Sequence, residues 1–350
     1  MTRRVRIGLA GLGRMGRVHA ASLAAGCPSA RLAAVFDADE AAARRAGERL
    51  GVPAAPSYAG LLAGDGIDAV AIATPTGTHA DLAIRACRAG KHVFCEKPIS
   101  LDRQATLDVI AAVEAAGVAF QPGFHRRFDP DWAAAADRIR AGELGEVYLF
   151  RTSLRDMTPP DPAFLSGSGG FFVDVTIHDL DTARWLAGEI TEVTAHGAAL
   201  SDPGFAEIGD VDTAVVVLRF ENGALGVIDD SRAAGYGYEC STEVMGRDAT
   251  VRIDHPQARN YEWRTAGSAS HRLPRDFAER FPEAYAAELE AFARCVLGGE
   301  PPRVTAYDAL AAFDLAHAAG QSWRSGHTVM VEPQRTGRNV IYAAVKQQNR

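Results

Sequence analysis

The stretch Val5-Arg6-Ile7-Gly8-Leu9-Ala10-Gly11-Leu12-Gly13-Arg14-Met15-Gly16 decides the fold of this chain. It opens with a short apolar run, as expected of a strand buried in a parallel sheet. Gly11 would allow a tight turn, Gly13 the close approach of backbone to a pyrophosphate, and Gly16 the packing of helix on strand. Residues 14–25 predict that helix, with its N-terminus facing the phosphates. The stretch therefore predicts a dinucleotide site.

A second predicted strand, residues 32–36, ends in Asp37, about 20 residues beyond the last glycine, where dinucleotide folds place an acid. A carboxylate there would bond the adenosine ribose 2′-hydroxyl and repel a 2′-phosphate, which favours NAD over NADP. Arg44 and Arg45 are expected on the outer face of the next helix. Two alternatives stay open: Asp37 only caps that helix, or the glycines serve packing or an S-adenosylmethionine site.

Composition excludes several classes of protein. A length of 350 residues favours two domains, and 47% hydrophobic with 23% charged residues is ordinary for a globular protein. A net charge of −7 argues against a nucleic-acid or anionic-membrane surface. The 5 cysteines are scattered without a C-x-x-C pair, which argues against disulfides or zinc and suits a reducing cytoplasm. We expect no membrane span, and Arg3-Arg4 is not followed by the apolar segment of an export signal.

Up to residue 124, predicted strands and helices alternate. The strands are 69–73, 91–95 and 118–121, with a short one near 52–55, and the helices are 80–89, capped by Thr78, and about 102–116. This alternation predicts a doubly wound parallel sheet, an NAD-binding Rossmann domain over residues 1–124. Thr74-Pro75-Thr76 would lie at the binding edge of that sheet. His79 would touch the nicotinamide side or be only a residue of the first helical turn.

The pattern changes after residue 125. Strands are predicted at 146–154, 211–220, 224–231, 239–245 and 329–331, and helices at 132–141, 182–186, 283–297 and 306–324, the last capped by Thr305. Asn222-Gly223 is a strong hairpin signal. We expect an α+β domain, 125–335, with a large, mostly antiparallel open sheet for substrate binding and oligomerisation. One sheet face would carry helices and the other would pair with another subunit in a dimer or tetramer. Residues 336–350 are expected to form a loosely held polar tail.

Two further motifs complete the pattern. Glu96-Lys97-Pro98 follows a strand, and Asp174 and His178 lie four residues apart, so on a helical turn they share one face. With them the chain resembles the Gfo/Idh/MocA family of NAD(P)-dependent sugar and polyol oxidoreductases, and within it the inositol 2-dehydrogenase branch. The resemblance also covers Gly123-Phe124-His125-Arg126-Arg127-Phe128-Asp129, Thr176-Ile177-His178-Asp179, Ser231-Arg232 with Tyr236-Gly237-Tyr238, and Phe281-Pro282-Glu283-Ala284-Tyr285.

The resemblance implies that Lys97, Asp174 and His178 form the catalytic set. A histidine, whose unperturbed pKa is about 6.5, suits removal of the hydroxyl proton as hydride leaves for the nicotinamide. The ammonium of Lys97 would stabilise the growing alkoxide and help to keep His178 neutral. Asp174 would orient the imidazole or hold a neighbouring hydroxyl. We expect the ammonium and the imidazole to converge over bound NAD.

The remaining expected contacts divide into two sets. The residues expected to bind NAD are Gly11, Leu12, Gly13, Arg14, Met15, Gly16, Asp37, Thr74, Pro75, Thr76, His79, Glu96 and Lys97. The residues expected to bind substrate are Lys97, His125, Arg127, Asp156, Asp174, His178 and Tyr236. His125 and the stretch Arg155-Asp156-Met157 depart from the close inositol enzymes, which leaves the choice of polyol open.

Structural alternatives stand beside these roles. Lys97 could be a surface charge, His178 a buried structural histidine and Asp174 a helix cap. Asp174, His178 and Asp179 could suggest a metal cluster, but Lys97 supplies the positive charge, so no metal is expected. Asp179 and Asp181 are taken as acids at a helix start. The predicted reaction is oxidation of a cyclic polyol, such as myo-inositol, to its ketone. The alternatives are another sugar dehydrogenase or keto-inositol reductase, and a non-catalytic NAD-dependent sensor.

Overall fold

The computed structural model describes residues 3–160, 162–165, 167–254, 262–298 and 300–344. The chain forms two compact units, and each is described by itself. The first comprises Met1–Asp129 and Pro282–Leu310, and the second Pro130–Phe281 and Ala311–Arg350. The units are not the contiguous stretches expected from the sequence, because a helix late in the chain packs within the first unit.

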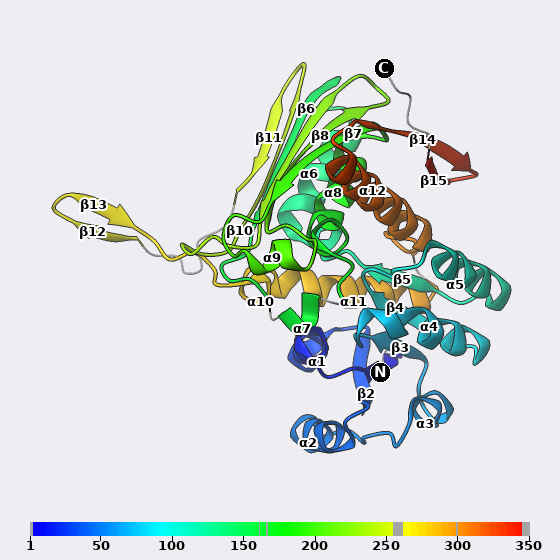
Figure 1. Cartoon of the computed structure of the whole chain (residues 1–350). Coiled ribbons are helices and arrows are strands. Elements are labelled where there is room, and N and C mark those ends of the chain that lie inside the picture. The colour runs from blue at the N-terminus through cyan, green and yellow to red at the C-terminus, as the bar shows by residue number, and fades with distance from the viewer. Residues whose placement is uncertain (1–2, 161, 166, 255–261, 299, 345–350) are drawn as a thin grey trace. The chain divides into compact units, whose positions relative to one another are not determined.

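The first unit is built on a parallel sheet of 5 strands in the order β2-β1-β3-β4-β5 (Figure 1). The strands are β1 (Val5–Ala10), β2 (Ala30–Phe36), β3 (Ala69–Ile72), β4 (His92–Glu96) and β5 (Phe120–Gly123). The order reverses direction beside β1, so the turns after β1 and β3 meet at the topological switch point. This is the doubly wound Rossmann sheet that the sequence predicts.

Helices connect these strands on both sides of the sheet. They are α1 (Arg14–Gly26), α2 (Glu40–Leu50), α3 (Tyr58–Ala63), α4 (His79–Arg88) and α5 (Arg103–Ala116), with short 3-10 turns η1 (Thr76–Thr78) and η2 (His125–Phe128). Because crossovers between parallel strands are right-handed and the strand order changes direction beside β1, α1 is expected on one face and α3, α4 and α5 on the other. From the end of the chain, α11 (Pro282–Val296) packs on α1 and buries Leu289 and Phe292 in the same core.

The glycines of the first turn have the expected roles. Gly11 has a φ of +93°, and a Cβ there would lie 2.4 Å from the carbonyl oxygen of Ala73. A Cβ on Gly16 would lie 1.9 Å from the carbonyl oxygen of Gly11. Both positions therefore require glycine, the first for the tight turn and the second for close packing of α1 on the strand.

Two local predictions in this unit are wrong, and one helix was missed. Residues 52–55 form no strand and contribute a single bridge, Val35 to Ala54, and the short helix α3 that follows was not expected. Thr78 stands at the start of α4 but makes no cap hydrogen bond to the helix. Its hydroxyl instead donates to the carbonyl of Pro75, which the tight turn brings to 2.8 Å.

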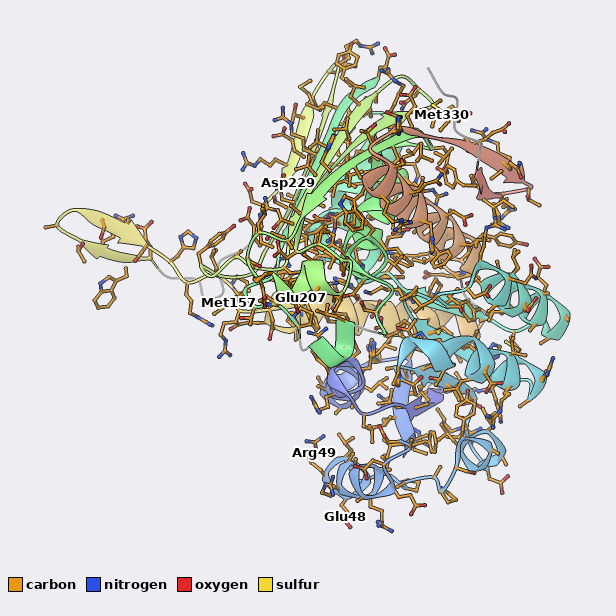
Figure 2. All side chains as sticks on the ribbon, viewed as in Figure 1. Glu48, Arg49, Met157, Glu207, Asp229 and Met330 are labelled. Atoms are coloured by element: carbon orange, nitrogen blue, oxygen red, sulfur yellow. The ribbon has the colours of Figure 1, made fainter. Side chains whose placement is uncertain are left out.

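The prediction for Arg44 and Arg45 is confirmed, because both are exposed on α2. Glu48 and Arg49, labelled in Figure 2, project from the same helix.

The second unit holds a sheet of 8 strands in the order β11-β10-β6-β9-β8-β7-β14-β15. The strands are β6 (Val147–Arg155), β7 (Ile190–Ala198), β8 (Thr213–Phe220), β9 (Leu225–Ser231), β10 (Glu239–Gly246), β11 (Thr250–Ile253), β14 (Val329–Thr336) and β15 (Asn339–Ala344). Neighbouring strands are antiparallel except β6 and β9, which are parallel. The large, mostly antiparallel sheet is confirmed, and so is the hairpin at Asn222-Gly223 between β8 and β9.

Helices cover one face of this sheet, as Figure 1 shows for α6, α8 and α12. The helical elements are α6 (Pro130–Arg140), α7 (Pro162–Leu165), a π-helical turn η3 (Phe172–Thr176), α8 (Ile177–Ala187), α9 (Gly204–Glu207), α10 (Phe277–Arg280) and α12 (Ala306–Ser325). Ser322 of α12 accepts from the backbone N–H of Ala195, and Trp323 donates to the carbonyl of Gly197. Thr305 and Asp308 form a capping box at the start of α12, which confirms that cap.

Some elements of this unit were not expected. β7 was missed, and β15 pairs with β14 inside the stretch expected to be a loose tail. A separate hairpin, β12 (Trp263–Thr265) with β13 (Ser268–Ser270), is exposed throughout. Among the described residues, no helix combines the length and apolar character needed to cross a bilayer.

Candidate active site

The glycine turn and Asp37 are joined directly. Asp37, at the end of β2, accepts a hydrogen bond from the backbone N–H of Leu12 at 2.7 Å and another from Asp39 at 3.0 Å. Asp39, not Asp37, caps α2 by accepting from Ala41 and Ala42. The capping alternative for Asp37 is therefore wrong, and its carboxylate is fixed against the glycine turn, where an adenosine ribose would bind.

The start of α1 suits a dinucleotide phosphate. Gly13 occupies the N-cap position without a side-chain cap, and no acidic residue lies in the first turn. A Cβ on Gly13 would meet no described atom within 4 Å, so this side of the turn is open to a close ligand. Arg14 is exposed and Met15 half-buried. The N–H groups and dipole of this helix end favour an anion, so these residues fit the pyrophosphate of NAD.

The turn after β3 is tied to the turn after β4 by His79. This histidine is 1% exposed; its Nε2 lies 2.7 Å from the carbonyl oxygen of Thr74 and its Nδ1 lies 2.9 Å from that of Pro98. Pro75 is exposed and Thr76 half-buried in the turn that His79 holds. The sequence did not predict this link, because no sequence motif connects a histidine to backbone carbonyls 5 residues before it and 19 residues after it.

Lys97 follows β4 and is half-buried. Its backbone N–H donates to Oε2 of Glu96 at 3.2 Å. Oε1 of the same carboxylate lies 2.6 Å from Nε2 of His19, a wholly buried residue of α1. Burial raises the pKa of Glu96, but the hydrogen bond and charge of His19, with Lys97 and His79, outweigh burial and lower it overall. Glu96 is therefore a buried carboxylate that stays charged beside Lys97.

Two predicted substrate residues of the first unit lie in or at η2 and are buried. His125 stacks on Tyr285 with ring centroids 4.8 Å apart. Arg127 pairs with Asp308 at 3.2 Å and is 7% exposed. Both side chains thus have partners within the unit, and their contact with substrate remains a prediction.

In the second unit, Asp174 and His178 come from consecutive helical segments. Asp174 lies in the π-helical turn η3 and His178 in the first turn of α8, and both are half-buried. Asp174 accepts from Nη1 of Arg232 at 3.0 Å. Arg232 is 1% exposed and its guanidinium lies 5.5 Å from the ring centroid of Phe171. Arg232 was not expected at the site, although Ser231-Arg232 belongs to the motifs that carry the family resemblance.

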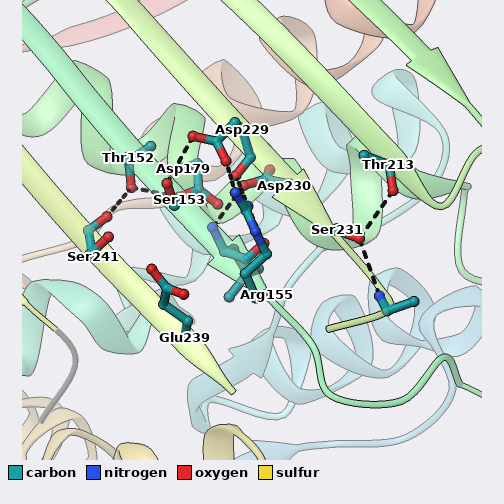
Figure 3. Close-up of polar contacts among 12 residues, drawn as sticks. Thr152, Ser153, Arg155, Asp179, Thr213, Asp229, Asp230, Ser231, Glu239 and Ser241 are labelled. Carbon is teal, nitrogen blue, oxygen red and sulfur yellow. Dashed lines mark hydrogen bonds and ion pairs between the residues drawn. The ribbon is translucent and has the colours of Figure 1, made fainter. Parts of the chain in front are cut away.

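The helix that carries His178 is anchored to the sheet by its neighbour Asp179. Asp179 is wholly buried and accepts from the hydroxyl of Thr152 on β6 at 2.9 Å (Figure 3). The same hydroxyl lies 2.9 Å from the carbonyl oxygen of Ser241 on β10, and its single proton can serve only one of these two acceptors at a time. The interpretation of Asp179 as a simple acid at a helix start is therefore incomplete, because it joins α8 to β6.

The last two predicted substrate residues lie outside the strands, Asp156 directly after β6 and Tyr236 in the loop between β9 and β10. Asp156 continues β6, where its N–H donates to the carbonyl of Ser231 and its carbonyl accepts from Ala234. Tyr236 is 61% exposed, donates to Glu239 at 2.8 Å, and lines a cavity of about 550 Å³ with Met157. Met157, which lines this cavity, is labelled in Figure 2.

The predicted set is thus divided between the units. Lys97 and the NAD residues belong to the first, and Asp174, His178, Asp156 and Tyr236 to the second, so convergence of Lys97 with His178 remains a prediction. In the described part of the chain one group of three potential metal ligands occurs, His19, Glu96 and Glu288. His19 and Glu96 are 2.6 Å apart, a direct hydrogen bond that leaves no space for an ion between them.

Family models match both parts of this chain. Residues 5–124 match the NAD-binding Rossmann fold of the oxidoreductase family Gfo/Idh/MocA, and residues 136–331 match the C-terminal alpha/beta domain of the same family.

Individual relatives extend over nearly the whole chain. It is 39% identical to scyllo-inositol 2-dehydrogenase (NAD(+)) of Bacillus subtilis, over 96% of this chain and 98% of the relative. It is 40% identical to myo-inositol 2-dehydrogenase of Thermotoga maritima, over 94% and 99%. Among solved structures, scyllo-inositol dehydrogenase from Lactobacillus casei with bound NAD(H) and scyllo-inositol has a TM-score of 0.88 at 30% identity, over 94% and 99%.

Proposed function

The chain belongs to the Gfo/Idh/MocA oxidoreductase family and is an NAD-dependent dehydrogenase, and on this premise we propose that it oxidises a secondary hydroxyl of a cyclic polyol to the ketone. Myo-inositol or a related inositol is the first candidate substrate, because the relatives named above are inositol dehydrogenases. The observation that carries the proposal is the carboxyl edge of the parallel sheet. There Asp37, fixed by Leu12, and Lys97, fixed by Glu96, follow strands of one sheet.

The coenzyme site fits NAD by its own chemistry. The glycine turn, Asp37 and the turn Thr74-Pro75-Thr76 would hold it, and bound NAD would supply the hydride acceptor. Asp37 would bond the ribose hydroxyls with the acceptor capacity that two backbone N–H bonds leave on its carboxylate.

The chain supplies the proton chemistry and the charge. His178 takes the hydroxyl proton of the substrate, which a neutral imidazole can do near pH 7. The ammonium of Lys97 stabilises the developing alkoxide. Asp174, held by Arg232, accepts a hydrogen bond from a neighbouring hydroxyl and so selects which hydroxyl faces His178. His125, Arg127, Asp156 and Tyr236 would complete the contacts to the ring hydroxyls.

Substitution of Lys97 tests this proposal. We expect Lys97→Ala to lose at least about 10²-fold in turnover of myo-inositol, the scale of a lost electrostatic donor, while it still binds NADH in a fluorescence titration. Lys91→Ala is the matched control. Lys91 directly precedes β4, whereas Lys97 directly follows it, and the ammonium of Lys91 donates to the carbonyl of Ile67. Near-normal turnover by Lys97→Ala would overturn the proposal.

A panel of polyols, aldoses and keto-inositols separates the related functions. Formation of NADH with an inositol supports the proposal, and preference for an aldose or for keto-inositol reduction identifies another sugar oxidoreductase. Binding of NADH without turnover on the whole panel would identify a sensor.

We also infer that the open face of the second sheet pairs with another copy of this chain in a dimer or tetramer. The strands alternate: Ala214, Val216 and Leu218 of β8 are buried, whereas Val215 and Val217 face the other way and are 41% and 44% exposed. Further large apolar side chains exposed on strands of this sheet are Leu225, Met245 and Met330. An exposed apolar surface of this kind is typical of a subunit interface.

We infer a reducing compartment, the cytoplasm, from the cysteines. All 5 cysteines of the chain are free, and Cys27, Cys87, Cys95 and Cys240 are buried. Thiol titration of the unfolded protein without reductant should count every cysteine. A lower count would contradict the inference.

A further inference from the structure

The carboxylate of Glu96 joins the two motifs that the function depends on. Glu96 is the last residue of β4, and its side chain turns inward, where it is 7% exposed. Oε1 contacts His19 on α1, the helix that follows the glycine turn, and Oε2 accepts the backbone N–H of Lys97. Two hydrogen bonds therefore connect the NAD-binding helix to the backbone of the lysine.

Packing fixes this carboxylate in place. A Cβ on Gly123 of β5 would lie 3.0 Å from Oε2 and 3.1 Å from Oε1, so the backbone of β5 lies against the carboxylate. The ring of His19 is held in turn by edge contacts with Phe94 and Tyr285, with centroids 5.1 and 5.9 Å away. The pair thus has little freedom to move, and the position of the Lys97 backbone follows from it.

The charges around the pair favour a single buried carboxylate. The ionisable groups near Glu96 are His19 from α1, Lys97 and His79 from the neighbouring turns, the adjacent thiol of Cys95, and Tyr285 and Glu288 from α11. Glu288 is wholly buried; burial first, and then the charge of Glu96, raise its pKa well above the ordinary value. Its Oε1 lies 4.0 Å from Nδ1 of His19, so it faces the far side of the ring, and its raised pKa favours the uncharged form of the acid there.

We propose that His19 and Glu96 are positioning residues for Lys97, which hold its backbone at a fixed place relative to the helix that binds NAD. The proposal rests on the proposed function, since it gives Lys97 its catalytic role. Without the pair, the chain would still fold around the other contacts of the sheet, but the ammonium would be less well placed. Small errors of placement reduce turnover more than they reduce binding.

Three variants test the proposal. Glu96→Gln keeps the shape of the side chain and removes its charge, His19→Leu removes the donor, and His19→Gln restores an N–H that can reach Oε1. We expect Glu96→Gln and His19→Leu to lose at least about 10-fold in kcat for myo-inositol, with KM and NADH affinity within about threefold of the parent, as for lost orientation. His19→Gln should recover most of the loss, which a merely structural role would not predict.

The control and the normalisation separate positioning from damage to the fold. The control is Glu290→Gln, on α11. The carboxylate of Glu290 accepts hydrogen bonds from the backbone N–H and the hydroxyl of Ser29, and this variant should keep the parent kcat. Turnover is counted per NADH-binding site, so that unfolded protein does not contribute. If His19→Leu does not fold, Glu96→Gln alone tests the proposal.

The outcomes distinguish the two proposals. If Lys97→Ala is inactive while Glu96→Gln and His19→Leu keep the parent kcat, the positioning role is wrong and the function stands. A rise in KM or a loss of NADH binding that accounts for the whole effect also overturns the positioning role. If Lys97→Ala is active, the proposed function itself fails.

Discussion

The guanidinium of Arg232 lies 3.0 Å from the carboxylate of Asp174, although 58 positions separate them in the chain. The pair is nearly closed to solvent, with 2% of the Arg232 side chain and 16% of the Asp174 side chain exposed. A half-buried carboxylate that is paired in this way is oriented by the guanidinium, which suits a residue proposed to hold a substrate hydroxyl.

Arg232→Met should therefore reduce turnover more than its effect on folding explains. Removing one member of a buried pair costs about 3 kcal/mol or more of stability, and we expect at least a tenfold lower kcat per NADH-binding site. The control is Arg184→Met, which breaks a comparably buried pair with Glu189 in the same unit. Steady-state kinetics and urea unfolding check both variants, and equal losses of kcat would contradict a special role for Arg232.

Asp37 should determine the choice of coenzyme. Asp37→Ser removes the charge that would repel a 2′-phosphate and a hydrogen-bond acceptor for the ribose. We expect NADH affinity to fall about tenfold, equivalent to about 1.4 kcal/mol, and NADPH affinity to rise. Asp39→Asn removes a neighbouring charge and keeps the cap of α2. Fluorescence titration with both coenzymes measures the result, and tighter binding of NADPH by the parent protein would overturn the assignment to NAD.

Glu288 should make the stability depend on pH. Burial raises its pKa in the folded state well above the ordinary value of 4.5. Between 4.5 and the folded pKa, the folded chain holds a proton that the unfolded chain has lost. The free energy of unfolding then falls by about 1.4 kcal/mol for each pH unit of increase. Glu288→Gln should remove this decline, so the variant gains stability relative to the parent as pH rises.

Urea unfolding at pH 5, 6, 7 and 8 measures that difference. Glu290→Gln controls for the loss of a carboxyl group from α11. If the free energies of unfolding of Glu288→Gln and the parent differ by a constant amount across this pH range, Glu288 does not hold its proton in the folded state and the prediction is wrong.

Gly123→Ala should disturb the turn that carries Lys97. The added methyl would approach the Glu96 carboxylate to 3.0 Å, closer than ordinary contact. We expect a loss of about 1–3 kcal/mol, as for overpacked sites, together with a lower kcat. Gly267→Ala is the control, because a Cβ there meets no described atom within 4 Å. Thermal unfolding and kinetics report the two effects, and a fully active, fully stable Gly123→Ala protein would contradict the packing argument.

The open sheet face should control assembly. Val217→Glu places a charge among the exposed apolar side chains of β8 and should shift the protein toward smaller species, since burying an unpaired charge is costly. Leu200→Glu alters another exposed apolar residue, outside the strands, and should leave the assembly unchanged. Light scattering after size-exclusion chromatography gives the masses. An unchanged mass for Val217→Glu would place the interface elsewhere.

Local patterns predicted the elements that depend on neighbours in sequence. The strand, glycine turn and helix over residues 5–26, the acid at Asp37, and the hairpin at Asn222-Gly223 follow from periodicity and turn chemistry, which act over a few residues. The strand predicted over residues 52–55 is absent, because this segment forms only one bridge to β2, between Ala54 and Val35, and strand propensity alone does not make a strand without further pairing.

The sequence by itself thus determined the Rossmann fold and the preference for NAD, and the family resemblance of its motifs made Lys97, Asp174 and His178 the candidate catalytic residues. Only the tertiary structure decided that His19 holds Glu96, that Arg232 holds Asp174, and that α11 belongs to the first unit. The physical reason is that buried charges must find partners wherever the fold brings them, and those partners come from distant parts of the chain, where no local pattern marks them.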